Sequence, residues 1–179
     1  MDEEDEASAL EQSRPIVFPE EWPEADRTVS GPFVVEAMLD PRWSTAPEGF
    51  LLSNAVVSTP CERRYASIEW EICFDQCLFQ GAVELTYTDF KRRVCFLGCT
   101  FNDRFNMEAA HLSELWIYES ARGTPTIFKS GANFFSIKIT GRLICERAQF
   151  LNESQEVYFN SIQISHHASL KETLFHGPV

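Results

Sequence analysis

The chain has 179 residues, of which 44% are hydrophobic, and carries a net charge of −12 at pH 7. This length and apolar content allow one domain with a substantial core and exclude a wholly disordered chain. The acidity is uneven, because residues 1–50 hold 13 Asp and Glu against three Arg, whereas residues 51–179 hold 14 against 12 Lys and Arg. The body is therefore nearly neutral, and no basic patch predicts direct nucleic-acid binding.

The N-terminal tail, residues 1–14, has the composition of a disordered acidic segment. It lacks the basic start and the apolar run of a signal peptide. No stretch of the chain approaches the roughly 18 apolar residues of a membrane span, so we expect no membrane partner. The expected location is cytoplasmic, with the six Cys as reduced thiols.

Residues 15–50 form an arm in which aromatic, Pro and acidic residues lie close together. Two interpretations of this arm stay open. In the first, Val17, Phe18 and Trp22 cover the open end of the domain that follows, and 31–39 supplies the cap itself. In the second, it docks on a partner protein. The candidate partner-binding residues are Phe18, Glu20, Glu21 and Trp22.

An eleven-residue repeat begins near residue 51. Small residues recur from Ala55 to Ala121, and four rows of inward-facing residues follow this period. In an extended segment, residues i and i+2 share one face, so each unit is a short strand ended by a tight corner. Three rows are apolar with two misfits, Arg63 and Gly123. These rows are Leu52, Phe74, Leu85, Phe96, Met107 and Tyr118; Val57, Ile68, Phe79, Phe90, Phe101 and Leu112; and Cys61, Ile72, Val83, Val94, Phe105 and Trp116.

The phase of this repeat slips twice. It moves by five residues within 124–131 and by three within 151–156. Both segments are rich in polar, Pro, Gly or Asn residues, which predicts loops there. The repeat then continues to Phe175.

The chain resembles the pentapeptide-repeat family, in which a small residue stands two positions before a central Leu or Phe. The matching segments are Cys77-Leu78-Phe79, Thr88-Asp89-Phe90, Cys99-Thr100-Phe101 and Ala148-Gln149-Phe150. The resemblance covers about Leu52 to Phe175 and implies an all-β, right-handed parallel β-helix with four faces per coil, a quadrilateral solenoid over 51–179. Because alternate repeats carry one extra residue, one coil should take 22 residues. A left-handed hexapeptide β-helix needs a period of 18 and is disfavoured.

A 22-residue coil places particular outward side chains one above the other. Opposite charges then meet in three places, which favours adjacent strands, whereas Glu62 over Glu84 does not. The three pairs are Glu69 with Lys91, Glu71 with Arg93, and Arg92 with Glu114.

Two Cys-x-x-x-Cys segments invite a zinc interpretation. However, Cys77 and Cys99 belong to the inward row, whereas Cys73 and Cys95 face outward. One metal ion cannot take ligands from both sides of a strand, so we expect no metal. We also expect no cofactor and no catalytic residues, since no catalytic motif is present.

The last coil should present an uncovered apolar end face, and such a face usually marks an interface. Its residues are Phe159, Ile162, Ile164, Leu170 and Phe175. The expected partner is a protein or a second copy of the chain, bound through this C-terminal coil.

The favoured function is a non-enzymatic protein–protein interaction or scaffold module. The alternative follows from the family resemblance: a DNA mimic that binds and inhibits a topoisomerase-like DNA-binding protein, which requires a continuous acidic stripe along the rod. An enzyme with its site on the loops at 124–131 and 151–156 is the third possibility.

Overall fold

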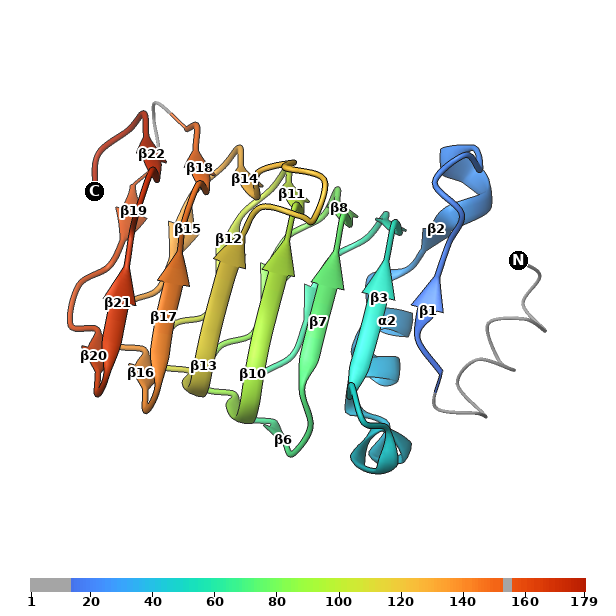
Figure 1. Ribbon diagram of the computed structural model, residues 1–179, viewed down its shortest axis with the longest axis horizontal. Helices are drawn as coiled ribbons and strands as arrows, with labels where there is room; N and C mark the ends of the chain where they lie inside the picture. Colours follow the sequence, from blue (N-terminus) through green and yellow to red (C-terminus); the bar gives the residue numbers. More distant parts are fainter. Residues whose placement is uncertain (1–13, 153–155) are drawn as a thin grey trace.

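Backbone hydrogen bonds between successive coils hold this protein together. The computed structural model describes residues 14–152 and 156–179. Its strands are short, parallel and stacked into a β-solenoid of about six coils, with little helix (Figure 1). Each strand within a column bonds the strand one coil before it and the strand one coil after it, as parallel pairing requires.

Each coil contributes strands to four faces. The first face contains β1 (Ile16–Val17), β3 (Phe50–Ser53), β7 (Ile72–Asp75), the ends of β10 (Asp89–Leu97) and β13 (His111–Tyr118), then β17 (Arg142–Cys145) and β21 (His167–Ser169). The second face contains β2 (Thr28–Val29), β4 (Val56–Val57), β8 (Leu78–Phe79), β11 (Thr100–Phe101), β14 (Ile127–Phe128), β18 (Gln149–Phe150) and β22 (Leu174–Phe175).

The third face contains β5 (Cys61–Glu62), β9 (Val83–Glu84), β12 (Phe105–Asn106), β15 (Ala132–Asn133) and β19 (Val157–Tyr158). The fourth face contains β6 (Ser67–Ile68), the starts of β10 and β13, β16 (Lys138–Ile139) and β20 (Gln163–Ile164). Because β10 and β13 continue around a corner, the first and fourth faces form one sheet.

The predicted coil length and the sizes of both slips are confirmed by the register, but the first loop lies between β13 and β14, so its prediction at 124–131 is wrong in part. Phe79 pairs with Phe101, 22 residues later, whereas Phe101 pairs with Phe128 across the first loop. Across the second loop, Phe150 pairs with Phe175. The inserted residues lie at corners, so the strands on either side keep their inward faces.

An irregularity between β10 and β13 was not predicted. Phe90 pairs with Leu112, but after a register shift Arg93 pairs with Glu114. The predicted pair of Arg92 with Glu114 is therefore wrong. The shift also reverses the expected facing of the next residues: Leu115 and Ile117 are fully buried, whereas Trp116 lies outward in register with Cys95.

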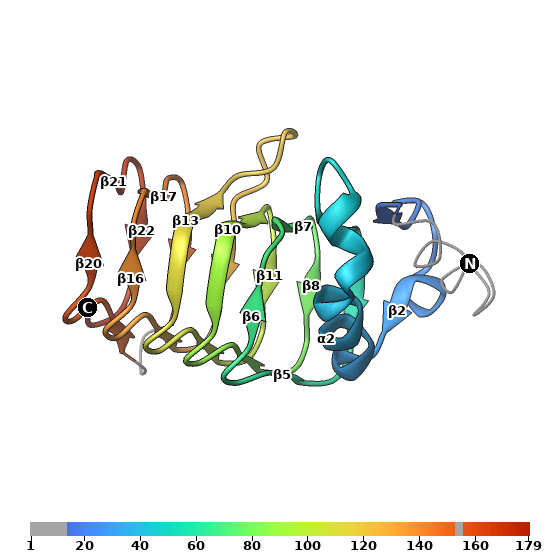
Figure 2. The same ribbon diagram turned by 90° about the horizontal axis from the view of Figure 1, so that it is seen from below.

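The arm supplies the first coil instead of lying across it. β1 pairs with β3, and β2 pairs with β4, so two faces start within the arm. The 3-10 helix η1 (Glu24–Arg27), the α-helix α2 (Gly31–Leu39) and the 3-10 helix η2 (Pro41–Thr45) complete this turn of the chain. Figure 2 shows α2 lying across the end of the strand stack, and α2 contacts β5.

Local sequence explains why a helix begins there. The Ser30 hydroxyl accepts a hydrogen bond from the Phe33 backbone N–H at 3.2 Å, and Pro32 stands in the first turn. Ser is a preferred N-cap and Pro suits the first turn of a helix. Val34 and Met38 are buried on the side of α2 that faces the strands, so the helix closes this end of the core.

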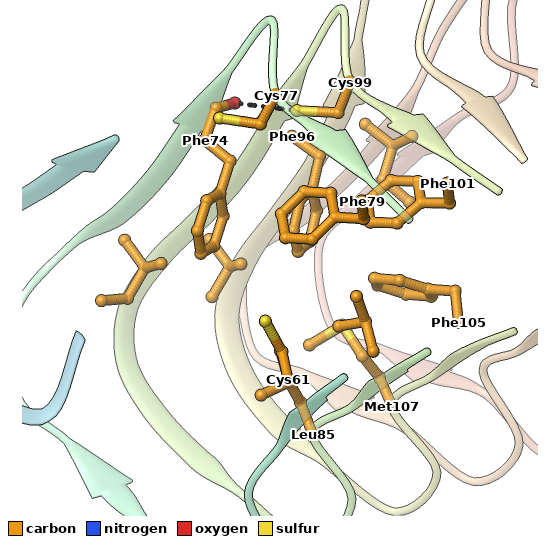
Figure 3. Packing of buried hydrophobic residues seen from close by; sticks show 14 of the residues in the cluster. Cys61, Phe74, Cys77, Phe79, Leu85, Phe96, Cys99, Phe101, Phe105 and Met107 are labelled. Carbon is orange, nitrogen blue, oxygen red and sulfur yellow. Dashed lines mark hydrogen bonds between the residues drawn. The ribbon is translucent and has the colours of Figure 1, made fainter. Parts of the chain in front are cut away.

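Columns of phenylalanine rings fill the interior (Figure 3). On the second face, Phe79, Phe101, Phe128 and Phe150 stack in turn, with ring centroids 4.7–4.9 Å apart and nearly parallel planes. Figure 3 shows Phe96 and Phe105 approaching this column from other faces, and they meet Phe101 edge-on. Such offset and edge-on contacts are favourable for aromatic rings, which explains the high Phe content.

The corners depend on left-handed backbone conformation. Along one corner the positive φ falls on Asn54, Gln76 and Gly98, each one coil apart. At Gly98 an added Cβ would lie 2.7 Å from the Ser120 Cβ, so this coil also requires the absence of a side chain. This corner therefore requires a left-handed backbone conformation and, at Gly98, a residue without a side chain.

Replacing Phe101 with Ala should lower the free energy of unfolding by about 3–5 kcal/mol, because it removes the centre of the ring column. Phe135 is 41% exposed, and Phe135→Ala should change stability by less than about 0.5 kcal/mol. Urea unfolding followed by circular dichroism measures both variants. Equal losses would contradict the assignment of the column as the main support of the core.

Candidate functional site

The candidate partner-binding residues of the arm do not share one environment. Phe18 is fully buried in the core, and its backbone carbonyl accepts a hydrogen bond from the Asn54 side chain at 2.9 Å. Trp22 is partly buried and packs against the core, whereas Glu20 and Glu21 are exposed. The expectation that Phe18 is available to a partner is therefore wrong, because the first coil already encloses it.

The arm also meets the first inserted loop. Glu20 forms an ion pair with Arg122, although about 100 residues separate them in the sequence. Arg122 belongs to the segment between β13 and β14, which projects from the rod in Figure 2. Both side chains are more than half exposed, so the pair contributes little to stability. Sequence periodicity carried no signal for this contact, since neither residue belongs to the repeat.

Replacing Phe18 with Ala should cost about 3–5 kcal/mol of folding free energy, because a fully buried ring leaves a cavity. The exposed neighbour provides the control: Glu21→Gln should shift stability by less than about 0.5 kcal/mol. Thermal unfolding measured by circular dichroism compares the two. A stable Phe18→Ala protein would argue for docking of this side chain on another molecule.

The C-terminal end face is uncovered by the described residues. Cys145, Phe150, Ile139, Ile137 and Phe134 are at most 1% exposed, and each has an inward counterpart in the last coil. Those counterparts are Leu170, Phe175, Ile164, Ile162 and Phe159, of which Leu170 is 49% exposed and the other four are partly buried. The inward positions of the last coil are therefore more exposed than those of earlier coils, because no further coil follows among the described residues (Figure 1).

This end also presents unpaired backbone. β20, β21 and β22 end their columns and have hydrogen-bonded strands on one side only among the described residues. Free strand edges beside apolar side chains favour pairing with another chain. The structure therefore brings the predicted end-face residues together on one surface.

Charges alternate along the outside of the first face. Arg93 Nε donates to Glu71 Oε1 at 3.0 Å, as predicted, and Arg142 Nε donates to Glu114 Oε1 at 3.0 Å. The Arg93 guanidinium also lies 4.1 Å from the ring centroid of Trp116, a cation–π distance. Alternation of sign in this column does not form an acidic stripe.

The third face carries polar side chains beside a surface hollow of about 580 Å³. Glu84, 3% exposed, pairs with Arg104 and accepts a hydrogen bond from the Asn106 side chain at 2.9 Å. Asn133 Nδ2 donates to Glu108 Oε2 at 3.3 Å. Gly131 and Glu156, from the ends of the predicted loops at 124–131 and 151–156, also line the hollow, which is ligand-sized.

A second hollow, of about 520 Å³, lies between η2 and the first face. Its lining includes Trp43, Trp70, Glu69, Glu71 and Arg92. Trp70 is tied by its indole N–H to the Met38 carbonyl at 3.0 Å, so it serves the cap.

The six Cys are free thiols. Burial raises the pKa of Cys61 and of Cys145 to about 12. Electrostatic interaction with the neighbouring Cys77 also raises the pKa of Cys61. Cys77 and Cys99 lie inside, where their thiols donate to the Leu52 and Phe74 carbonyls at 3.3 and 3.4 Å. These interior thiols serve packing.

The free energy of unfolding should fall as the pH rises from about 9 toward 12. An unfolded thiol has a pKa of about 8.5, and the folded values of Cys61 and Cys145 are about 12. The folded chain therefore holds these protons more tightly, so this stabilisation is complete below the unfolded pKa and is lost as the pH rises through the folded pKa. Urea midpoints measured across this range, with a Cys61→Ala, Cys145→Ala protein as control, test this. An equally steep fall in the control would contradict it.

Metal and membrane features were also sought in the described parts of the chain. Within residues 14–152 and 156–179, no group of three or more His, Cys, Asp or Glu is placed to hold a metal ion. In the same ranges, no helix is long and apolar enough to cross a membrane.

Comparisons with protein-family models, with curated proteins and with solved structures found no match.

Proposed function

We propose that this protein is a non-enzymatic protein–protein interaction or scaffold module that binds through the end face formed by its last coil. The observation that carries the proposal is the exposure of inward side chains at this end. Leu170 is 49% exposed, whereas Cys145, one coil earlier at the same inward position, is fully buried. A partner that supplies apolar side chains and strand edges would restore the missing cover.

A second copy of the chain is the simplest partner of this kind, because its own end face has the same apolar side chains and free edges. Two copies can meet at this face through a two-fold axis, which makes each surface the complement of the other. A different protein with an exposed strand edge would fit by the same chemistry.

The repeat pattern also supports a family assignment. We infer that the chain is an atypical pentapeptide-repeat protein with eleven-residue double repeats. Small residues such as Cys77, Thr88, Cys99 and Ala148 stand two positions before buried Phe residues, as in that family. The coil of about 22 residues, in place of 20, is its departure from the family pattern.

DNA mimicry has less support. A mimic needs regularly spaced negative charge, whereas the outer column of the first face alternates Glu71, Arg93, Glu114 and Arg142. On the third face, Glu62 and Glu84 are followed by Asn106 and Asn133. Neither column provides a continuous acidic stripe.

An enzyme on the inserted loops also has less support. Polar groups beside the larger hollow already bind one another, since Arg104 pairs with Glu84 and Asn133 donates to Glu108. A general base needs a group free to receive a proton from a substrate. The hollow therefore favours polar binding over proton transfer.

The experiment that tests the proposal is association of Leu170→Asp compared with Leu174→Asp. Leu174 is 43% exposed and precedes the inward residue Phe175, so it faces away from the interior of the coil. A charge at Leu170 should lower association by at least tenfold, or about 1.4 kcal/mol, because it would be desolvated at the interface. The Leu174 variant should associate like the unaltered protein.

Sedimentation velocity of the pure protein measures self-association, and affinity capture on immobilised protein measures a different partner. A dimer or a captured protein that Leu170→Asp weakens and Leu174→Asp retains would support the proposal. A monomer whose captured proteins are unaffected by Leu170→Asp would overturn it. Deleting residues 1–50 is unsuitable, because β1, β2 and the buried Phe18 belong to the first coil.

A further inference from the structure

Two cysteine side chains are stacked on the outside of the first face. Cys73 of β7 and Cys95 of β10 are register partners on adjacent parallel strands. Their chain neighbours Ile72, Phe74, Val94 and Phe96 are buried, so the two thiols lie on the opposite, outward side of the sheet. The strands β7 and β10 lie side by side in Figure 1.

The pair is flanked by apolar side chains in its column and by a charged side chain, Arg93. In the same outward column, Leu51 pairs with Cys73, and Trp116 pairs with Cys95. Cys95 is 2% exposed, whereas Cys73 is partly exposed and provides access from solvent. Arg93 lies within electrostatic range of both sulfurs and is held by Glu71.

The two thiols are close enough to affect each other's ionisation. A side-chain hydrogen bond with Cys95, followed by burial, raises the pKa of Cys73 well above its ordinary value. Adjacent strands stand about 4.8 Å apart, and in-register side chains are parallel across that gap. A disulfide prefers Cβ atoms about 3.5–4.5 Å apart, which is slightly less than this strand spacing, and both thiols are free in the structure.

The spacing between neighbouring coils suits a bridge from one sulfur to the other through a metal ion. A zinc–thiolate bond is about 2.3 Å long, and a linear sulfur–metal–sulfur unit with bonds of about that length spans about 4.6 Å. This length is close to the spacing between coils. Thiolate ligands select soft ions, of which Cu(I) is the prominent example.

We propose that Cys73 and Cys95 form a two-coordinate site for a soft monovalent cation of the Cu(I) class, which bridges neighbouring coils. Zinc is excluded at this place because a structural zinc site needs four ligands, and the outward face supplies two sulfurs. A linear ion needs only these two, so the objection that Cys77 and Cys99 face inward does not apply to it.

Binding changes charge but not oxidation state. The two thiols release two protons to solvent, and two thiolate bonds form to the one cation, which leaves a complex with a net charge of −1. The positive charge of Arg93 lies close enough to offset that charge. The indole of Trp116 shields the site from water on the Cys95 side.

The interior pair provides a contrast on the same two coils. Cys77 and Cys99 are at most 1% exposed, and their thiols are already bonded to backbone carbonyls. An ion would have to enter the close-packed core to reach them. The partly exposed Cys73 makes the outer pair accessible to an ion, whereas Cys77 and Cys99 are buried and serve packing.

The test is a titration of the full chain with Cu(I), supplied anaerobically as a complex with a coloured chelator. We expect the protein to remove one equivalent of Cu(I) from the chelator. Loss of an outer-shell partner alone weakens metal sites by 10–100-fold, so Cys73→Ala or Cys95→Ala should weaken binding by more than about 100-fold. Cys61→Ala, which removes an inward thiol, should still bind one equivalent.

Trp116 supplies a second readout. Cu(I) beside Cys95 should quench part of the tryptophan fluorescence, and Trp116→Phe should lose that quenching while still binding one equivalent. Circular dichroism checks that each variant is folded, and mutation of either Cys alone tests the pair in two independent proteins.

Three outcomes would overturn the proposal. One is no transfer of Cu(I) from the chelator to the unaltered protein. Another is unchanged binding by the Cys73→Ala, Cys95→Ala double variant, which would place the ion on interior thiols. The third is rapid formation of a Cys73–Cys95 disulfide under mild oxidant in the folded protein, because the sulfurs would then approach too closely for a linear site.

Discussion

In-register hydrogen bonding between coils is the constraint on which the structure depends. Each short strand satisfies its backbone by pairing with strands one coil away, so no strand is stable alone. Because the register repeats, each side chain lies beside its counterpart in the next coil. Each side chain therefore packs mainly against the equivalent side chains of the neighbouring coils. This explains why Phe rings stack on Phe rings in the interior and why Glu lies beside Arg on the outside.

The same constraint determines where the chain tolerates change. Extra residues are accommodated at corners, as between Ser120 and Thr126, because the strands on both sides can still pair. The Ser120 hydroxyl accepts the backbone N–H of Thr124 at 3.3 Å, and the Thr126 hydroxyl donates to the Phe96 carbonyl at 2.9 Å. Local hydrogen bonds thus close the loop onto the regular coil.

Most of the solenoid could be predicted from the sequence because its cause is periodic. The alternation of small and large residues identified the coil length and the inward Phe columns, and the loss of phase identified both loops. The facing of Trp116 could not be predicted, because a register shift in β10 against β13 depends on how two coils pair. Leu115 and Trp116 are both apolar, so composition did not distinguish them.

The end structures were less predictable than the repeat. That 31–39 would be a cap followed from its apolar residues, but the burial of Phe18 depends on β1 joining the first face. The contact of Glu20 with Arg122 joins two non-repeating segments and left no pattern in the sequence. The end-face residues lie together as predicted, because they continue the periodic rows. The repeat carries no information about which partner binds them.

The difference between the two ends has a consequence for assembly. At one end α2 buries Val34 and Met38 against the strands, although β1 and β2 also end their columns there, and at the other end β20, β21 and β22 end theirs and the inward Leu170 is 49% exposed. Among the described residues, uncovered inward apolar side chains are therefore concentrated at the C-terminal end of the rod. Contact between two such surfaces consumes both, so growth stops at a closed pair, whereas a rod open at both ends would add copies without limit and form a fibre.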